Sequence, residues 1–150
     1  YMCKDFTAIK RFIAAGIKVV MLSGDNFNRH MAEKRNIDFY CSRNKDLSLD
    51  KSRYLEVFNE KYNIAIDKMA FVGDDYFDLS IIRRCSSTFC PSDSPSIVKE
   101  NSHYVLKSKG GEGVLIELYD LFISKNWINE PTEESVADLD KKEISSKEME

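Results

Sequence analysis

Apolar residues recur along this chain with two different spacings. Over residues 5–15, Ile9, Phe12 and Ile13 lie three or four positions apart, which places them on one face of a helix. Other apolar positions form short continuous runs rich in β-branched residues, such as residues 17–22. Runs of this kind are typical of strands buried on both faces of a sheet.

The two patterns alternate from the first residues to Trp127. Strands that alternate with helices predict right-handed crossovers and a parallel sheet covered on both sides. The predicted fold class is therefore α/β: a single domain with a doubly wound, Rossmann-like parallel sheet. The predicted strands are residues 17–22, 37–40, 69–72, 87–90 and 103–106. The predicted helices are residues 5–15, 26–34, 50–61, 77–84 and 112–124, with a further helical turn that begins at Pro95.

The periodicity ends after Trp127, and the composition changes at the same point. Residues 128–150 hold eight acidic residues and three lysines, a balance of −5, and they include Pro131. An acidic segment without an apolar helical face is typical of disorder. We predict a domain over residues 1–127, a size that suits one core, and a disordered tail over residues 128–150.

Composition excludes several classes of protein. The net charge of −3 leaves residues 1–127 near neutrality, so we expect no nucleic-acid partner. The sequence has no run of 18 apolar residues and no pattern of a secretion signal, so we expect no membrane partner and a cytoplasmic location. The four cysteines form no CxxC pair and there are two histidines, which argues against a zinc site.

Polar residues that could bind a ligand or take part in catalysis follow two of the predicted strands and begin one helix. Ser23 and Gly24 follow the first strand, Lys51 begins a helix, and the sequence GDDYFD at residues 73–78 follows the third strand. Parallel sheets bind ligands beyond the carboxyl ends of their strands. We therefore predict that Ser23, Lys51 and Asp74 converge on one site, although they are far apart in the sequence.

The acidic cluster permits two interpretations. Asp74, Asp75 and Asp78 supply hard oxygen ligands at a strand end, which suits Mg2+ together with water and a phosphate. Acidic residues also cap helices, because their charge complements the helix dipole. Three acids after a glycine at the end of a buried strand favour the metal site.

Ser23 and Lys51 carry less information individually. A serine after a strand is usually a turn residue, and most lysines lie in solvent. The functional interpretation is that the Ser23 hydroxyl, the Gly24 amide and the Lys51 ammonium hold the oxygens of a phosphoryl group.

Together these residues resemble the motifs of the haloacid-dehalogenase superfamily. Residues 19–24 are similar to its second motif, Lys51 to its third, and residues 73–78 to its fourth, GDDxxD. The resemblance implies a Mg2+-dependent phosphatase in which Asp74 binds the metal and Asp75 and Asp78 orient it. The order of the motifs along the chain is specific, although each motif alone is not.

Within the superfamily, the chain is most similar to the phosphatases that lack a large cap domain and act on 3-deoxy-manno-octulosonate 8-phosphate. The C-terminal domains of acylneuraminate cytidylyltransferases are similar too. Lys4-Asp5 and the glycines Gly110 and Gly111 match elements of that subfamily. The resemblance implies that Asp5, Gly110 and Gly111 contact a small phosphorylated sugar or sugar acid, and that the protein is a homo-oligomer, by resemblance a tetramer.

Three departures separate the sequence from that subfamily. The first motif, DxDG, which supplies the nucleophile and the general acid, does not occur before Asp5, so we expect the sequence to be a fragment of a longer protein. Asp25 stands where the subfamily has arginine and would repel a sugar-acid carboxylate, while Phe6 and Ala8 replace glycines. An alternative is a non-catalytic oligomerisation module related to the cytidylyltransferase domains.

We predict that the 150-residue chain alone has no phosphatase activity, because loss of a covalent nucleophile removes several orders of magnitude of rate. The measurement is hydrolysis of p-nitrophenyl phosphate by the purified chain. Turnover at about 1 s−1 or faster would contradict the prediction.

Overall fold

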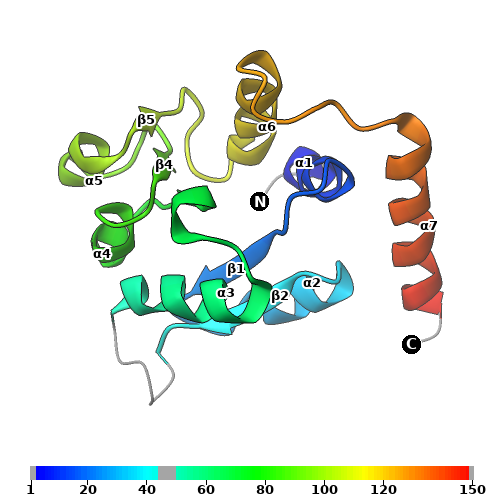
Figure 1. The fold of residues 1–150 in the computed structure, drawn as a ribbon, viewed down its shortest axis with the longest axis horizontal. Helices are drawn as coiled ribbons and strands as arrows, with labels where there is room; N and C mark the ends of the chain where they lie inside the picture. Colours follow the sequence, from blue (N-terminus) through cyan, green and yellow to red (C-terminus); the bar gives the residue numbers. More distant parts are fainter. Residues whose placement is uncertain (1–2, 44–49, 149–150) are drawn as a thin grey trace. The chain divides into compact units, whose positions relative to one another are not determined.

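The computed structural model describes residues 3–43 and 50–148 and divides the chain into two compact units. Unit 1 consists of Tyr1–Cys41 and Leu115–Glu150, and unit 2 consists of Ser42–Val114. Most predicted elements form within two or three residues of their predicted bounds (Figure 1). In the described ranges, no helix is long and apolar enough to cross a membrane.

Unit 1 contains two parallel strands and four helices. Its strands pair in register from Val20 opposite Asp38 to Ser23 opposite Cys41. The parallel pairing confirms the predicted crossover through a helix. The elements are α1 (Cys3–Ala14), β1 (Val20–Ser23), α2 (Arg29–Lys34), β2 (Asp38–Cys41), α6 (Val114–Ser124) and α7 (Glu133–Glu148).

The predicted apolar face of α1 forms the core of unit 1. Ile9 is buried in a cluster with Ala32 and Ile37. Phe12 makes edge-to-face contacts with Tyr119 and Phe122 of α6, at centroid distances of 5.4 and 5.3 Å. The three-and-four spacing of apolar residues thus holds α1 against both the sheet side and α6.

Unit 2 contains a three-stranded parallel sheet in the order β3-β4-β5. Ile82, Cys90 and Val98 form its buried cluster, so Cys90 acts as a small apolar residue. The helical elements are η1 (Lys51–Arg53), α3 (Tyr54–Tyr62), η2 (Ile66–Lys68), η3 (Tyr76–Asp78), α4 (Leu79–Ile82) and α5 (Ser96–Asn101). The strands are β3 (Ala70–Val72), β4 (Ser87–Cys90) and β5 (Tyr104–Val105).

The predicted disorder of the acidic tail is wrong for Glu133–Glu148, which form α7. The helix begins with a cap, because the Thr132 hydroxyl accepts a hydrogen bond of 3.1 Å from the Ser135 amide. Its acids pair with basic residues of α1, a stabilisation that a search for apolar periodicity does not detect. The predicted boundary at residue 127 stays a prediction.

Asp5 has a structural role that the sequence did not predict. The residue is 1% exposed, and its Oδ1 accepts a hydrogen bond of 2.9 Å from the amide of Leu115 in the first turn of α6. A buried carboxylate at a helix start satisfies an amide that has no partner within the helix. Asp5 therefore joins α1 to α6, and its contact with a substrate stays a prediction.

We expect Asp5→Ala to lower the free energy of unfolding by about 1–3 kcal/mol, because it leaves the Leu115 amide without this acceptor. Asp5→Asn should cost less, since its amide oxygen can still accept. Urea denaturation measures the difference, with Asp120→Ala, an exposed position on α6, as the control. A change for Asp5→Ala within about 0.5 kcal/mol of the control would contradict the structural role.

Candidate functional site

A buried ion pair in unit 2 joins two of the predicted site residues. Lys51 Nζ donates to Asp78 Oδ1 at 2.6 Å, and the two side chains are 11% and 6% exposed. Lys51 is the first residue of η1 and Asp78 is the last residue of η3, so the pair spans 27 positions of the sequence. The structure therefore brings the third and fourth motifs together, as predicted.

The second oxygen of Asp78 holds the loop that follows β3. Asp78 Oδ2 accepts hydrogen bonds from the amides of Asp74 and Asp75, at 2.9 and 3.1 Å. A Cβ atom at Gly73 would lie 2.9 Å from the Asp78 side chain and 2.6 Å from the ring of Phe71. Glycine is required at position 73 because the Asp78 carboxylate approaches the backbone so closely.

Asp75 serves as the cap of η3. Its Oδ1 accepts a hydrogen bond of 2.6 Å from the Tyr76 amide, and with Asp78 it forms a reciprocal capping box. Of the two interpretations of the acidic cluster, capping therefore holds for Asp75 and Asp78. Both oxygens of Asp78 have partners within the protein, so Asp78 fixes the loop, and its role toward a metal stays a prediction.

Asp74, like Asp75, faces solvent. The residue is exposed by its accessible area, yet the protein around its carboxyl group still removes enough water to raise the pKa of Asp74. The negative charges of Asp78 and Asp75 raise this pKa further, and the positive charge of Lys51 opposes them. The Asp74 amide donates to Asp78, which fixes the backbone from which the Asp74 carboxylate extends.

Asp74 and its surroundings fit a Mg2+ ion that is bound by a carboxylate and by phosphate oxygens together. Mg2+ prefers one or two carboxylates together with water and phosphate oxygens, and a divalent cation would relieve the crowding of negative charge at Asp74. In residues 3–43 and 50–148, no group of three His, Cys, Asp or Glu side chains could hold a metal ion. Asp74 can therefore supply one ligand of an incomplete set.

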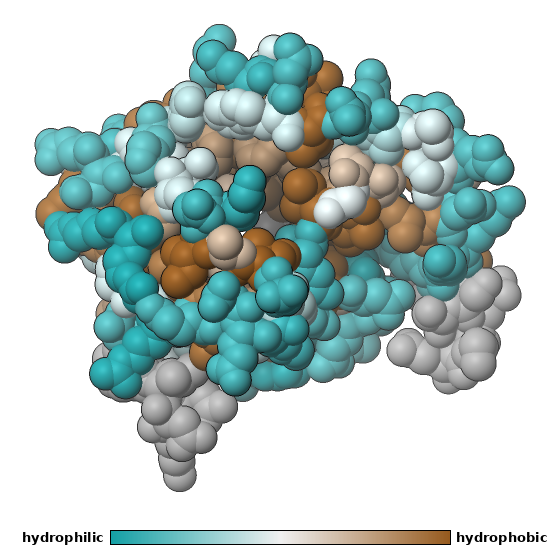
Figure 2. Space-filling model, in the orientation of Figure 1, coloured by the Kyte–Doolittle hydropathy of each residue, from teal (hydrophilic) through white to brown (hydrophobic). Residues whose placement is uncertain are grey.

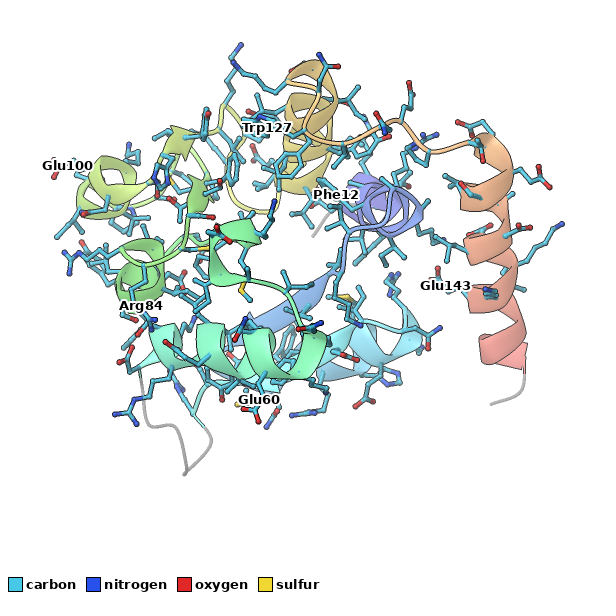
Figure 3. The ribbon with its side chains drawn as sticks, in the orientation of Figure 1. Phe12, Glu60, Arg84, Glu100, Trp127 and Glu143 are labelled. Atoms are coloured by element: carbon cyan, nitrogen blue, oxygen red, sulfur yellow. The ribbon has the colours of Figure 1, made fainter. Side chains whose placement is uncertain are left out.

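Hydrogen bonds from neighbouring residues hold η1, the segment that begins with Lys51. The Asp50 carboxylate caps η1 by accepting from the Ser52 amide at 3.0 Å and from the Ser52 hydroxyl at 2.7 Å. Arg84, which is labelled in Figure 3, donates to the Ser52 carbonyl at 2.9 Å and also pairs with Glu56. Arg84 was not predicted as a site residue, because an exposed arginine at a helix end carries no distinctive sequence signal.

Ser23 and Gly24 lie at the end of β1 in unit 1, as predicted. The Ser23 hydroxyl accepts from the Asp25 amide at 3.4 Å, and Asp25 Oδ1 accepts from the Phe27 amide at 2.9 Å. The thiol of Cys41 lies 3.8 Å from the Gly24 carbonyl oxygen. Since these residues belong to the other unit, their convergence with Lys51 and Asp74 stays a prediction.

Gly110 and Gly111 lie in a turn that Asp93 anchors. Asp93 Oδ1 accepts from the Gly110 amide at 2.9 Å. Gly111 has a φ of 78°, a conformation that favours glycine, and a Cβ there would have open space around it. The positive φ thus explains why glycine occupies position 111. A substrate contact of either glycine stays a prediction.

The comparisons with known proteins agree with the motifs. A family model described as haloacid dehalogenase-like hydrolase matches residues 45–118, which include Lys51 and Asp74. A phosphatase acting on 3-deoxy-D-manno-octulosonate 8-phosphate, from Haemophilus influenzae, is 27% identical over 123 residues, covering 80% of this chain and 66% of that protein. The cobalt-bound structure of that phosphatase matches with a TM-score of 0.74 and 26% identity over 83% of this chain and 71% of its own.

The chain has the fold of haloacid-dehalogenase-like hydrolases, and the family model covers slightly less than half of it. The phosphatase of Moraxella catarrhalis, solved with a magnesium ion, a phosphate ion and a KDO molecule, shares this fold, with a TM-score of 0.73 at 20% identity over 83% of this chain and 70% of its own. The chain spans slightly less than two thirds of the Haemophilus influenzae relative and 30% of a Yersinia pestis relative. The activity of these longer relatives is therefore assigned to this chain only as a proposal.

We expect Asp74→Asn to stabilise the protein at pH 7, because folding raises the pKa of Asp74 and so disfavours its charged form. The gain should be at most about 1 kcal/mol, since solvent screens charges at an exposed group. It should shrink as the pH falls through the raised pKa and vanish below the ordinary value of 3.8, where both folded and unfolded chains are protonated.

Urea denaturation between pH 3 and pH 7 tests this, with the exposed Asp67→Asn as the control. Equal pH profiles for both variants would show that the surroundings of Asp74 do not disfavour its charge.

Proposed function

We propose that this chain provides the phosphate- and metal-binding part of a Mg2+-dependent phosphomonoesterase that acts on a small phosphorylated sugar or sugar acid. The observation that carries the proposal is the buried Lys51–Asp78 pair, which holds a cation and the loop of Asp74 in one place. The similarity to octulosonate phosphatases supports the reaction class and the sugar phosphate.

Lys51 acts as the fixed cation of the site. Its ammonium group has three donors, and the contact with Asp78 uses one of them at 2.6 Å. The other donors can bind phosphoryl oxygens, and Asp78 keeps the long side chain from occupying other rotamers. A cation held in this way stabilises the growing charge of a phosphoryl transfer without having to reorganise.

Asp74 acts as a metal ligand in this proposal. A bound Mg2+ would neutralise phosphate charge and orient the phosphoryl group for in-line attack. Asp75 and Asp78 contribute by holding the loop on which Asp74 lies. The resemblance assigns Ser23 and the Gly24 amide to a further phosphoryl oxygen, and it assigns the nucleophile to a motif that does not occur before Asp5.

Asp25 bears on the choice of substrate. Its carboxylate accepts from the Phe27 amide and is exposed, so a negative charge lies two positions after Ser23. Asp25 would repel a substrate with a carboxylate near this position. This favours a sugar phosphate without a carboxylate over a phosphorylated sugar acid. The relatives described above are phosphatases and do not support the alternative of a non-catalytic module.

We expect inorganic phosphate to bind more tightly in the presence of Mg2+, and Mg2+ alone to bind weakly, because Asp74 supplies only one protein ligand. Lys51→Met should weaken phosphate binding at least about tenfold, since a charge-assisted contact is worth roughly 1.5–3 kcal/mol. Asp74→Asn should remove the enhancement by Mg2+. Isothermal titration calorimetry measures all three effects.

Two controls separate binding from folding. Lys68→Met removes an exposed lysine of the same unit, and Lys51→Arg keeps the charge next to Asp78. Circular dichroism verifies that each variant is folded. Phosphate binding that survives Lys51→Met in a folded protein, or Mg2+ binding in the micromolar range that survives Asp74→Asn, would overturn the proposed site.

A further inference from the structure

One face of α7 carries acidic residues that meet basic residues of unit 1. Glu133, Asp140 and Glu143 are separated by seven and three positions, so they lie on the same side of the helix. Figure 1 shows α7 alongside α1 and α2, and Glu143 projects from it toward these helices in Figure 3. The helix is therefore docked within unit 1 through its acidic face.

Four ion pairs make this contact. Lys10 Nζ pairs with Asp140 and lies 2.8 Å from Glu143 Oε2. Arg11 donates to Glu133 Oε1 at 2.9 Å. Arg35, at the end of α2, lies 3.9 Å from Glu143 Oε1. The three cations thus form a basic surface on α1 and α2, defined here by Lys10, Arg11 and Arg35.

Charged and apolar residues both contribute to the docking of α7. Among residues 133–144, whose side chains are described, Glu143 is buried, Val136 and Leu139 are partly buried, and Ile144 is 49% exposed. Figure 2 shows hydrophilic and hydrophobic residues side by side on this part of the surface. The exposed and partly exposed ion pairs of α7 are individually weak and respond to salt.

The fit between α7 and the basic surface is incomplete at Arg35. The Nε atom of Arg35 is buried, and no acceptor among the described residues is within hydrogen-bond distance of it. The nearest Glu143 oxygen, at 3.9 Å, is too far to accept from it. The Arg35 guanidinium stacks over Phe6 at 3.7 Å, and its Nη1 atom donates to the Met31 carbonyl at 3.4 Å. An acidic group placed closer to Arg35 would satisfy this buried donor, so a better ligand than α7 is physically possible.

We propose that Lys10, Arg11 and Arg35 form a docking surface for acidic helices, and that α7 is its displaceable occupant within the same chain. The partner is an acidic helix of another protein, with carboxylates spaced as at positions 133, 140 and 143. Such a helix exchanges with α7 when it offers the shorter contact to Arg35. The proposal uses none of the residues of the phosphate site and does not depend on the proposed function.

Hydrogen exchange of the full chain tests whether α7 is held by charge. In 1 M NaCl, where the Debye length falls to about 3 Å, the amides of α7 should exchange at least about tenfold faster than in 10 mM NaCl. The amides of β4 in unit 2 should change little. Equal acceleration in both places would indicate general unfolding and would overturn the proposal, as would an α7 insensitive to salt.

A peptide in trans tests the docking surface itself. The probe is a fluorescent peptide of residues 130–148, added to the full-length double variant Asp140→Lys/Glu143→Lys, whose own α7 no longer fits the cations. The matched control is Glu134→Lys/Asp138→Lys, which makes the same charge change at exposed positions of α7 away from this face.

The peptide should bind the double variant at least about tenfold more tightly than the wild type or the control, because α7 in cis competes at a high effective concentration. Adding Lys10→Glu to the double variant should abolish this binding. Equal affinity for the double variant and the control, or binding that Lys10→Glu leaves unchanged, would overturn the proposal.

Discussion

The buried ion pair of Lys51 and Asp78 is the contact on which the candidate site depends. Removing two charges from water is costly, and the cost is offset only when each charge is fully paired and hydrogen-bonded. Asp78 meets this condition, since one oxygen binds Lys51 and the other accepts from two backbone amides. Loss of either partner would leave a buried charge, which typically destabilises a protein by about 3–5 kcal/mol.

The pair also explains the conformation of the loop after β3. A side chain at position 73 would collide with Phe71 and with Asp78, so the loop requires glycine there. The Asp75 carboxylate caps the start of η3. Asp74 is thereby left exposed, with a raised pKa. A carboxylate whose charge is disfavoured by its surroundings is stabilised by a bound cation, which is the role proposed for Asp74.

Electrostatics in unit 1 has a different character. The pairs between α7 and α1 are partly exposed, so each is worth about 1 kcal/mol or less and is weakened by salt. Lysine–carboxylate pairs occur in both units. The pairs of α7 therefore differ from the buried pair of unit 2 in their exposure to water and not in the kind of charged group. A buried pair fixes a loop, while an exposed set of pairs holds a helix that can be replaced.

The sequence by itself determined most of the elements and the main chemistry. The spacing of Ile9, Phe12 and Ile13 predicts α1, short apolar runs predict the strands, and their alternation predicts parallel pairing. The motif at residues 73–78 and Lys51 could be predicted to meet, because a helix that leads into a parallel strand begins at its carboxyl edge. These features follow from local periodicity and from topology.

Tertiary structure alone decided how the individual carboxylates are used. Asp5, Asp74 and Asp78 are the same residue type at plausible ligand positions, yet one caps a distant helix, one faces solvent and one pairs with a lysine. Likewise α7 depends on cations of α1 that lie more than a hundred positions away in the sequence. The role of a charge depends on burial and on partners from distant segments, and neither is encoded in the local pattern of the chain.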